Sequence, residues 1–191
     1  MQMSKLPTAL AIALDAHKTQ IRKGTSIPYI SHPMAVASIA LEFGATEDQA
    51  IAALLHDAIE DGGASYAHSI EALFGTYVLT LVQGCTDGIP DQSGEKALWI
   101  DRKTAYLEHL QEASDEVLLV SCSDKLHNAR AIVSDLITEG PSVFNRFSAT
   151  TEQTLWYYRQ LATIFTNRKT PPAKALESAV SQMEALSQSA W

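Results

Sequence analysis

The 191-residue sequence is poor in cysteine and in basic residues. Its two cysteines, Cys85 and Cys122, are too few for a cysteine zinc cluster or a disulfide framework. Both lie in or beside apolar stretches, so we expect buried free thiols. Lysine and arginine total 14 against 22 aspartate and glutamate, a formal net charge of −8. Because nucleic-acid-binding proteins generally present a basic surface, this balance argues against nucleic acid as a partner.

Long apolar runs are also lacking. Nothing in the sequence approaches the roughly 18 apolar residues of a membrane-spanning helix. The apolar stretch near the start is interrupted by Asp15 and His17, and it has neither a cationic segment nor a convincing cleavage site. We therefore expect no membrane association and a cytoplasmic location. With 46% hydrophobic and 19% charged residues, the chain is long enough for one domain with a substantial core.

Apolar residues recur mostly at intervals of three and four, which is the spacing of one helix face. The pattern predicts helices over 6–21, 33–43, 46–61, 65–74, 75–84, 95–111, 114–139, 148–167 and 173–187. Thr46 and Gln49 have the spacing of a capping box at one of these helix starts. No set of strands with hairpin turns is indicated. The sequence therefore predicts an all-α, single-domain bundle of about eight or nine helices over 1–191.

One predicted helix combines apolar residues with a strongly polar face. It contains His56, Asp57, Glu60 and Asp61, which fall within an arc of about 140° at 100° per residue. Burying ionised groups costs several kcal/mol each unless they are paired or bind a metal. The last two acids would also lie in the final turn of the helix, where the helix dipole disfavours negative charge. We therefore expect a cation at this face.

Polar residues interrupt two further apolar segments. Asp124, His127 and Asn128 share one side of the helix predicted over 114–139, and His32 lies where another helix begins. Imidazole and carboxylate ligands suit zinc, manganese, iron or cobalt. If these helices converge, a divalent cation would be held by a candidate set of four ligands: His32, His56, Asp57 and Asp124.

The order of these residues resembles that of the HD-domain metal-dependent phosphohydrolases. More narrowly, AHKTQIRKGTSIPYISHP, AALLHDAIED and SDKLHNAR resemble the hydrolase domain of the stringent-response enzymes and the stand-alone small alarmone hydrolases, over roughly 9–160. The resemblance implies an HD-type helical bundle with a C-terminal helical extension over 161–191. It also implies a Mn²⁺-dependent enzyme that removes the 3′-pyrophosphate from a nucleotide such as (p)ppGpp or (p)ppApp. Gly62 and Gly63 stand where these hydrolases often have threonine, and the choice between guanine and adenine stays open.

The same resemblance implies a role for each candidate residue. It makes His32, His56, Asp57 and Asp124 the ligands of Mn²⁺, with other divalent ions as alternatives. Glu60 and Asp61 would orient or deprotonate the attacking water. The nucleotide substrate would be bound by five residues: Arg22, Lys23, Lys103, Lys125 and Asn128. We expect His127 to lie buried beside the ligands rather than to be one of them.

Two other interpretations stay open. The first is a phosphatase of the same fold that acts on another phosphate ester, such as a nucleoside monophosphate or NADPH. The second is a non-catalytic module that senses a metal or a nucleotide. The pair Glu60 and Asp61 argues against the second, because ligand binding alone does not require a general base. The sequence leaves the oligomeric state open.

Overall fold

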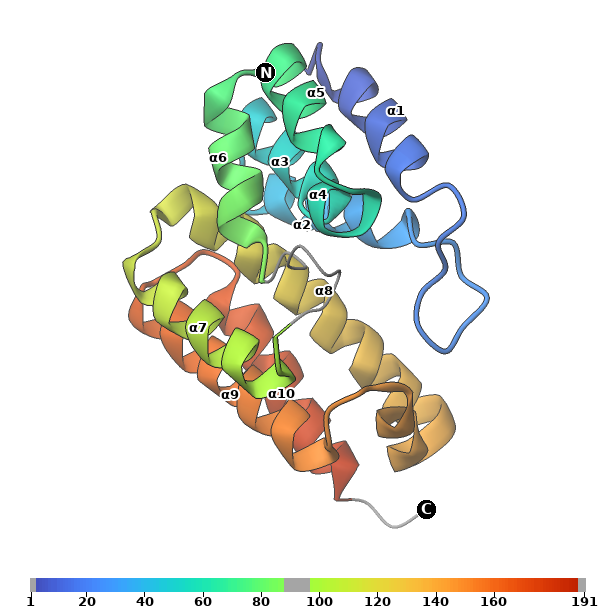
Figure 1. Cartoon of the computed structure of the whole chain (residues 1–191). Helices are drawn as coiled ribbons and strands as arrows, with labels where there is room; N and C mark the ends of the chain where they lie inside the picture. The colour runs from blue at the N-terminus through green and yellow to red at the C-terminus, as the bar shows by residue number, and fades with distance from the viewer. Residues whose placement is uncertain (1–2, 88–96, 189–191) are drawn as a thin grey trace.

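The longest described helix of the computed structural model is α8 (Asp115–Glu139), with 25 residues. Its buried side chains lie around most of its circumference and include Val117, Leu126 and Leu136, as in a helix that is enclosed by neighbours. It runs between an N-terminal group of helices and a C-terminal group (Figure 1). The structure describes residues 3–87 and 97–188.

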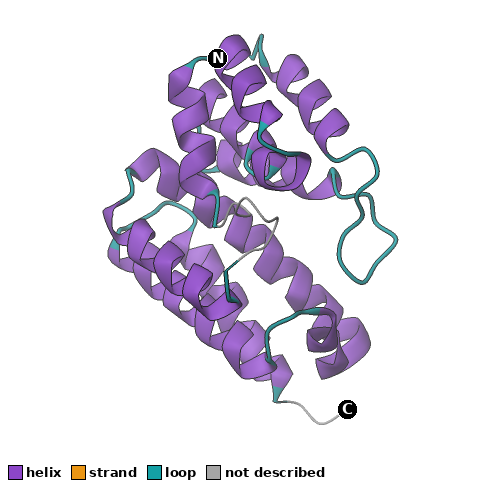
Figure 2. Ribbon diagram, viewed as in Figure 1, coloured by secondary structure: helices purple, strands orange, loops and turns teal. Residues whose placement is uncertain are grey.

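The two groups account for most of the described chain. The N-terminal group consists of α1 (Leu6–Ala16), α2 (Ser31–Glu42), α3 (Glu47–Leu55), α4 (Ala58–Gly62), α5 (Ser65–Phe74) and α6 (Thr76–Cys85). The C-terminal group consists of α7 (Trp99–Glu112), α9 (Thr151–Asn167) and α10 (Ala173–Ser187), and the 3₁₀ helix η1 (Gly140–Arg146) follows α8. Figure 2 shows helices and loops throughout the described residues, with one isolated bridge between Ile21 and Pro28. The predicted all-α fold is confirmed.

The helix predicted over 46–61 is divided in two, and this part of the prediction is wrong. Its start is as expected, with Thr46 and Gln49 in a capping box. The helical run then breaks at His56 and Asp57, between α3 and α4. The His56 ring donates from Nδ1 to the Ala53 carbonyl oxygen (2.8 Å), which in an uninterrupted helix accepts from the amide of Asp57.

This break reverses one electrostatic expectation. Glu60 and Asp61 lie in the first turn of α4, not in the last turn of a long helix. Because α4 has only five residues, the dipole penalty expected at the end of a long helix does not apply to these two acids. The helix predicted over 6–21 also differs, because it ends at Ala16 and a turn begins at His17. The start predicted for the helix over 95–111 lies outside the described residues.

Two glycines permit close approaches that matter for the site. A Cβ atom at Gly62 would lie 2.7 Å from the Tyr66 ring and 3.2 Å from the Cβ atom of Ala16, so α4 packs directly against the end of α1. A Cβ atom at Gly24, where φ is +73°, would lie 2.5 Å from Cδ of Arg146. The loop after α1 therefore rests against η1.

Two further expectations concern membrane-spanning helices and the two cysteines. Within the described ranges, no helix is both long and apolar enough to cross a bilayer. Cys85 and Cys122 are both buried with free thiols, as the sequence predicts.

Truncation of Leu136 tests the central position of α8. Leu136 is fully buried (0% exposed), and Leu136→Ala is expected to lower the free energy of unfolding by about 2–5 kcal/mol because it leaves a cavity. Ile137 is the matched control: it is 58% exposed, and Ile137→Ala is expected to change that free energy by less than about 0.5 kcal/mol. Urea unfolding followed by circular dichroism measures both. Equal losses would contradict the enclosure of α8.

Candidate metal centre

Three segments that are far apart in the sequence bring imidazole and carboxylate groups to one point. His32 lies in α2, His56 follows the last residue of α3, and Asp124 lies in α8; one ligand atom of each is within 4.8 Å of the others. His32 Nε2 is 3.1 Å and His56 Nε2 is 3.7 Å from Asp124 Oδ1. Asp57 Oδ2 is 3.0 Å from His56 Nε2 and 3.6 Å from His32 Nε2. All four predicted ligands therefore converge.

The outer nitrogen of each histidine is held by a partner behind the centre. Because the Ala53 carbonyl can only accept, His56 Nδ1 carries a hydrogen, and the Nε2 atom of the neutral ring offers its lone pair inward. His32 Nδ1 lies 2.7 Å from His127 Nδ1. A His32 ring that coordinates through Nε2 must donate from Nδ1, so His127 accepts with its Nδ1 atom. His127 thus lies behind the ligands and orients one of them.

Each of the two aspartates accepts a hydrogen bond from a neighbouring side chain. Asp57 Oδ2 accepts from the Tyr29 hydroxyl (2.6 Å), and Asp124 Oδ2 accepts from Lys125 Nζ (2.6 Å). Burial raises the pKa of both carboxyls, but the charge of His56 beside Asp57 and of Lys125 beside Asp124 outweighs it and holds each pKa below its usual value. Both carboxylates are therefore ionised at neutral pH.

The two histidines predicted to be ligands differ in the charges that act on them. Burial lowers the pKa of His56, but the negative charges of Asp57 and Asp124 outweigh it and raise that pKa to about 9. For His32 burial prevails and lowers the pKa. Burial, followed by the charge of His32, lowers the pKa of His127 to about 4. A metal ion at this point would therefore compete with a proton on His56.

The donor set fits a divalent cation. His56 Nε2 is buried and has no hydrogen-bond partner among residues 3–87 and 97–188, although it faces carboxylate oxygens. One buried carboxylate, one half-buried carboxylate and two inward imidazole nitrogens are costly to hold together without a positive charge between them. Mixed nitrogen and oxygen ligands of this kind are typical of zinc, manganese, iron and cobalt sites.

A groove of about 360 Å³ lies beside the centre. Arg22, Lys23 and Asn128 line it, as does Tyr29, which bonds to a predicted ligand. Asn128 connects the groove to the centre: it donates from Nδ2 to Asp124 Oδ1 (2.6 Å), and its Oδ1 atom accepts from Arg22 Nη2 (2.9 Å). Three of the five predicted substrate-binding residues therefore share one surface that reaches the predicted ligands.

Lys103 and Lys125 lie elsewhere. Lys103 lines a smaller cavity of about 180 Å³ together with Trp99 and Tyr157, and Lys23 lines both this cavity and the groove, so the two adjoin. Lys103 pairs with Asp87, and its Nζ atom lies 4.9 Å from the centre of the Tyr157 ring. Lys125 is buried and lines neither space. Its Nζ atom is bonded to the ligand carboxylate described above, so its contact is with the centre.

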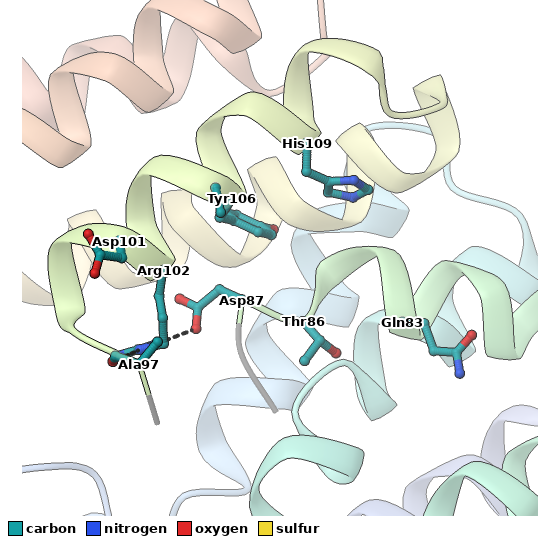
Figure 3. Close-up of a pocket in the computed structure, with 9 residues that line it drawn as sticks. Gln83, Thr86, Asp87, Ala97, Asp101, Arg102, Tyr106 and His109 are labelled. Carbon is teal, nitrogen blue, oxygen red and sulfur yellow. Dashed lines mark hydrogen bonds and ion pairs between the residues drawn. The ribbon is translucent and has the colours of Figure 1, made fainter. Parts of the chain in front are cut away.

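A third cavity, of about 530 Å³, lies between the end of α6 and α7. Figure 3 shows Arg102 reaching Asp87 across one end of it, with a distance of 2.9 Å from Nη1 to Oδ1, while Tyr106 and His109 project from α7. The residues described around this cavity include none of the predicted site residues. It is therefore separate from the groove beside the metal centre.

The two predicted catalytic acids occupy α4. Glu60 is half-buried, and Asp61 is exposed and accepts a hydrogen bond from Gln20 Nε2 (2.9 Å). Burial raises the pKa of Tyr29, and the charges of Asp57 and then Asp61 raise it further, so the charge of Asp61 reaches the hydroxyl that holds a predicted ligand. Sequence reasoning missed Tyr29 and Gln20, because loop spacing carries no periodic signal that says where a side chain points.

The chain is similar to known proteins over most of its length. A sequence model of the family described as HD domain matches residues 9–154. The chain is 36% identical over 139 residues to the bifunctional (p)ppGpp synthase/hydrolase SpoT of Escherichia coli K12, which covers 70% of this chain and 19% of that protein. It is 38% identical over 121 residues to the guanosine-3′,5′-bis(diphosphate) 3′-pyrophosphohydrolase MESH1 of Danio rerio, covering 62% of this chain and 63% of that protein.

A solved structure extends the likeness to nearly the whole chain. It is described as a metazoan ortholog of SpoT that hydrolyzes ppGpp and plays a role in starvation responses. It superimposes with a TM-score of 0.69 at 26% identity and covers 97% of this chain and 95% of that one. The chain itself spans about a fifth of the length of the bacterial relative and just under two thirds of the zebrafish one.

Substitution of His56 tests the metal centre. The protein purified with divalent metal is expected to carry about one ion per chain by elemental analysis, and removal of that ion with EDTA is expected to lower the Tm. His56→Asn is expected to lose the ion and to melt at the same temperature with and without EDTA. The matched control is His68→Asn, which changes an exposed histidine of α5 and is expected to behave as the unsubstituted protein. Full metal content in His56→Asn would contradict the assignment.

Proposed function

The chain belongs to the HD domain family, and we propose that it is a cytoplasmic, Mn²⁺-dependent hydrolase that removes the 3′-pyrophosphate from a nucleotide such as (p)ppGpp or (p)ppApp. One observation carries the proposal: four donors, three of them buried, converge beside a groove lined by Arg22, Lys23 and Asn128. The zebrafish and Escherichia coli relatives and the solved metazoan structure are named for hydrolysis of (p)ppGpp, which supports the substrate class.

In this proposal the ligands of Mn²⁺ are His32, His56, Asp57 and Asp124. A bound divalent ion supplies Lewis acidity, which lowers the pKa of a coordinated water and polarises a phosphoryl oxygen. The protein contributes orientation: Tyr29 holds one of the ligand carboxylates. Lys125 and His127 hold two further ligands in the same way, and such outer partners typically set ligand basicity and geometry.

Glu60 and Asp61 supply the proton acceptor. Both lie in the turn that begins directly after the ligand Asp57, so their carboxylates are carried on the same rigid segment as a ligand. An ionised carboxylate near a water can orient it and accept its proton as the new phosphorus–oxygen bond forms.

The cations of the groove would bind the phosphates. Arg22 and Lys23 lie on the loop above the groove, and Lys103 lies in the adjoining cavity. Because the chain has a net charge of −8, an anionic nucleotide requires such local cations. Asn128 offers an amide to a hydroxyl or phosphate oxygen. The burial of Lys125 favours an indirect role for it, through Asp124.

A nucleotide assay tests the proposed activity. With Mn²⁺ present, the protein is expected to release pyrophosphate from ppGpp or from ppApp, and EDTA is expected to abolish release. The His56→Asn variant is the matched inactive control. Release of orthophosphate from NADPH or a nucleoside monophosphate, with no pyrophosphate from either alarmone, would overturn the proposal in favour of the phosphatase alternative.

A double substitution tests the acid pair. Glu60→Gln with Asp61→Asn is expected to retain metal and nucleotide binding but to lower kcat by about 10²–10⁴-fold, because it removes the proton acceptor. Glu108→Gln with Glu112→Gln removes the same charge from exposed positions of α7 and is the matched control, with unchanged turnover expected. Unchanged kcat in the first variant would show that other groups activate the water.

A further inference from the structure

The turn after α1 places a glutamine between Asp61 and a buried histidine. Gln20 Nε2 donates to Asp61 Oδ2 at 2.9 Å, and Gln20 Oε1 lies 2.7 Å from His17 Nδ1. A carboxylate only accepts hydrogen bonds, so the amide nitrogen faces Asp61 and the amide oxygen faces the imidazole. That oxygen also only accepts, so His17 Nδ1 carries a hydrogen. The directions of both hydrogen bonds therefore follow from the chemistry of the groups.

His17 is held firmly. Its residue is only 3% exposed, and its ring packs on the ring of Tyr29 with centroids 4.9 Å apart. The amide of Tyr29 donates to the Gln20 carbonyl oxygen (2.9 Å), while the Tyr29 hydroxyl bonds to Asp57. The turn that carries His17 and Gln20 is thus bonded to Tyr29, and Tyr29 in turn donates a hydrogen bond to the predicted ligand Asp57.

The packing of α4 against α1 keeps Asp61 within reach of this turn. Gly62 has room for no side chain, because a Cβ atom there would lie 3.2 Å from the Cβ atom of Ala16 at the end of α1. The Tyr66 hydroxyl, one turn further along, donates to Asp15 Oδ2 (2.6 Å). The separation of Asp61 and Gln20 is therefore set by the backbone packing of two helices.

The Nε2 atom of the His17 ring gives no reason for a histidine at this position. Nε2 is buried and has no hydrogen-bond partner in the described part of the chain. An unpartnered buried polar atom costs free energy, and a phenylalanine would pack on Tyr29 without that cost. What the imidazole adds is the Nδ1 hydrogen bond to Gln20.

We infer that Gln20 and His17 are positioning residues for Asp61, an inference that rests on the proposed function. An exposed carboxylate rotates freely unless something holds it. Gln20 holds one oxygen of Asp61, which sets the plane in which the other oxygen lies, and His17 fixes the amide that does so. The carboxylate is thereby pre-oriented to accept a proton from the attacking water, and proton transfer depends steeply on such geometry.

A double-mutant cycle tests the inference. Gln20→Met is expected to lower kcat on the order of tenfold while KM changes by less than about twofold, because only the reacting geometry is disturbed. In an Asp61→Asn background the same change is expected to have no further effect on kcat. Gln182→Met, at an exposed glutamine that bonds to Ser178 in its own helix, is the matched control with unchanged kcat. Effects of Gln20 and Asp61 that multiply would overturn the inference.

A second variant keeps the test independent of how Gln20→Met folds. His17→Phe retains a ring against Tyr29 and removes only the hydrogen bond to Gln20. It is expected to lower kcat by about threefold, again with little change in KM, and to have no effect in the Asp61→Asn background. A fall in kcat that persists in that background would show that His17 acts on the fold rather than on Asp61.

A spectroscopic readout requires no substrate. The ¹⁵N NMR signals of His17 are expected to show the Nδ1–H tautomer, and the side-chain amide signals of Gln20 are expected to shift in Asp61→Asn. An Nε2–H tautomer for His17, or unmoved Gln20 amide signals, would overturn the positioning arrangement. If these signals are as expected and no nucleotide is hydrolysed, the proposed function fails while the hydrogen-bond arrangement stands.

Discussion

Two negative charges, on the half-buried Asp57 and the buried Asp124, are the constraint on which the site depends. Each lies within 4 Å of both inward-facing histidine nitrogens, and each accepts a hydrogen bond from a hydroxyl or an ammonium group. Those partners offset only part of the desolvation cost of two carboxylates. The centre is therefore built to receive positive charge, and a proton on His56 or a divalent cation meets the same need.

The apolar helices around the centre strengthen the interactions between its charged groups. α8 is enclosed over most of its circumference, yet it carries Asp124 and Lys125 in its buried middle. In such surroundings charges interact more strongly than they do in water. The same core also holds α2 and α3 against α8, so the stability of the bundle and the geometry of the centre have a common origin.

The loop between α1 and α2 connects the centre to the groove. Tyr29 supports a ligand, Arg22 reaches Asn128, and Gln20 reaches Asp61, all within one short segment that rests against η1 through Gly24. Loops often carry binding and catalytic groups because a rigid scaffold positions them. Here the loop between α1 and α2 carries residues proposed to contact a metal ligand, the substrate and the proton acceptor.

The sequence alone determined the helical class, most helix bounds and the choice of four candidate donors, because helical periodicity and unusual polar residues on apolar faces are local signals. Only the tertiary structure decided that these donors converge. The sequence did not reveal the break at His56. There the His56 side chain bonds to the Ala53 carbonyl oxygen, which in an uninterrupted helix would accept a backbone hydrogen bond. Nor did it reveal Tyr29, Gln20 or the burial of Lys125. Those depend on which segments meet in space, and contacts between distant residues of a loop and a helix leave no periodic trace in the chain.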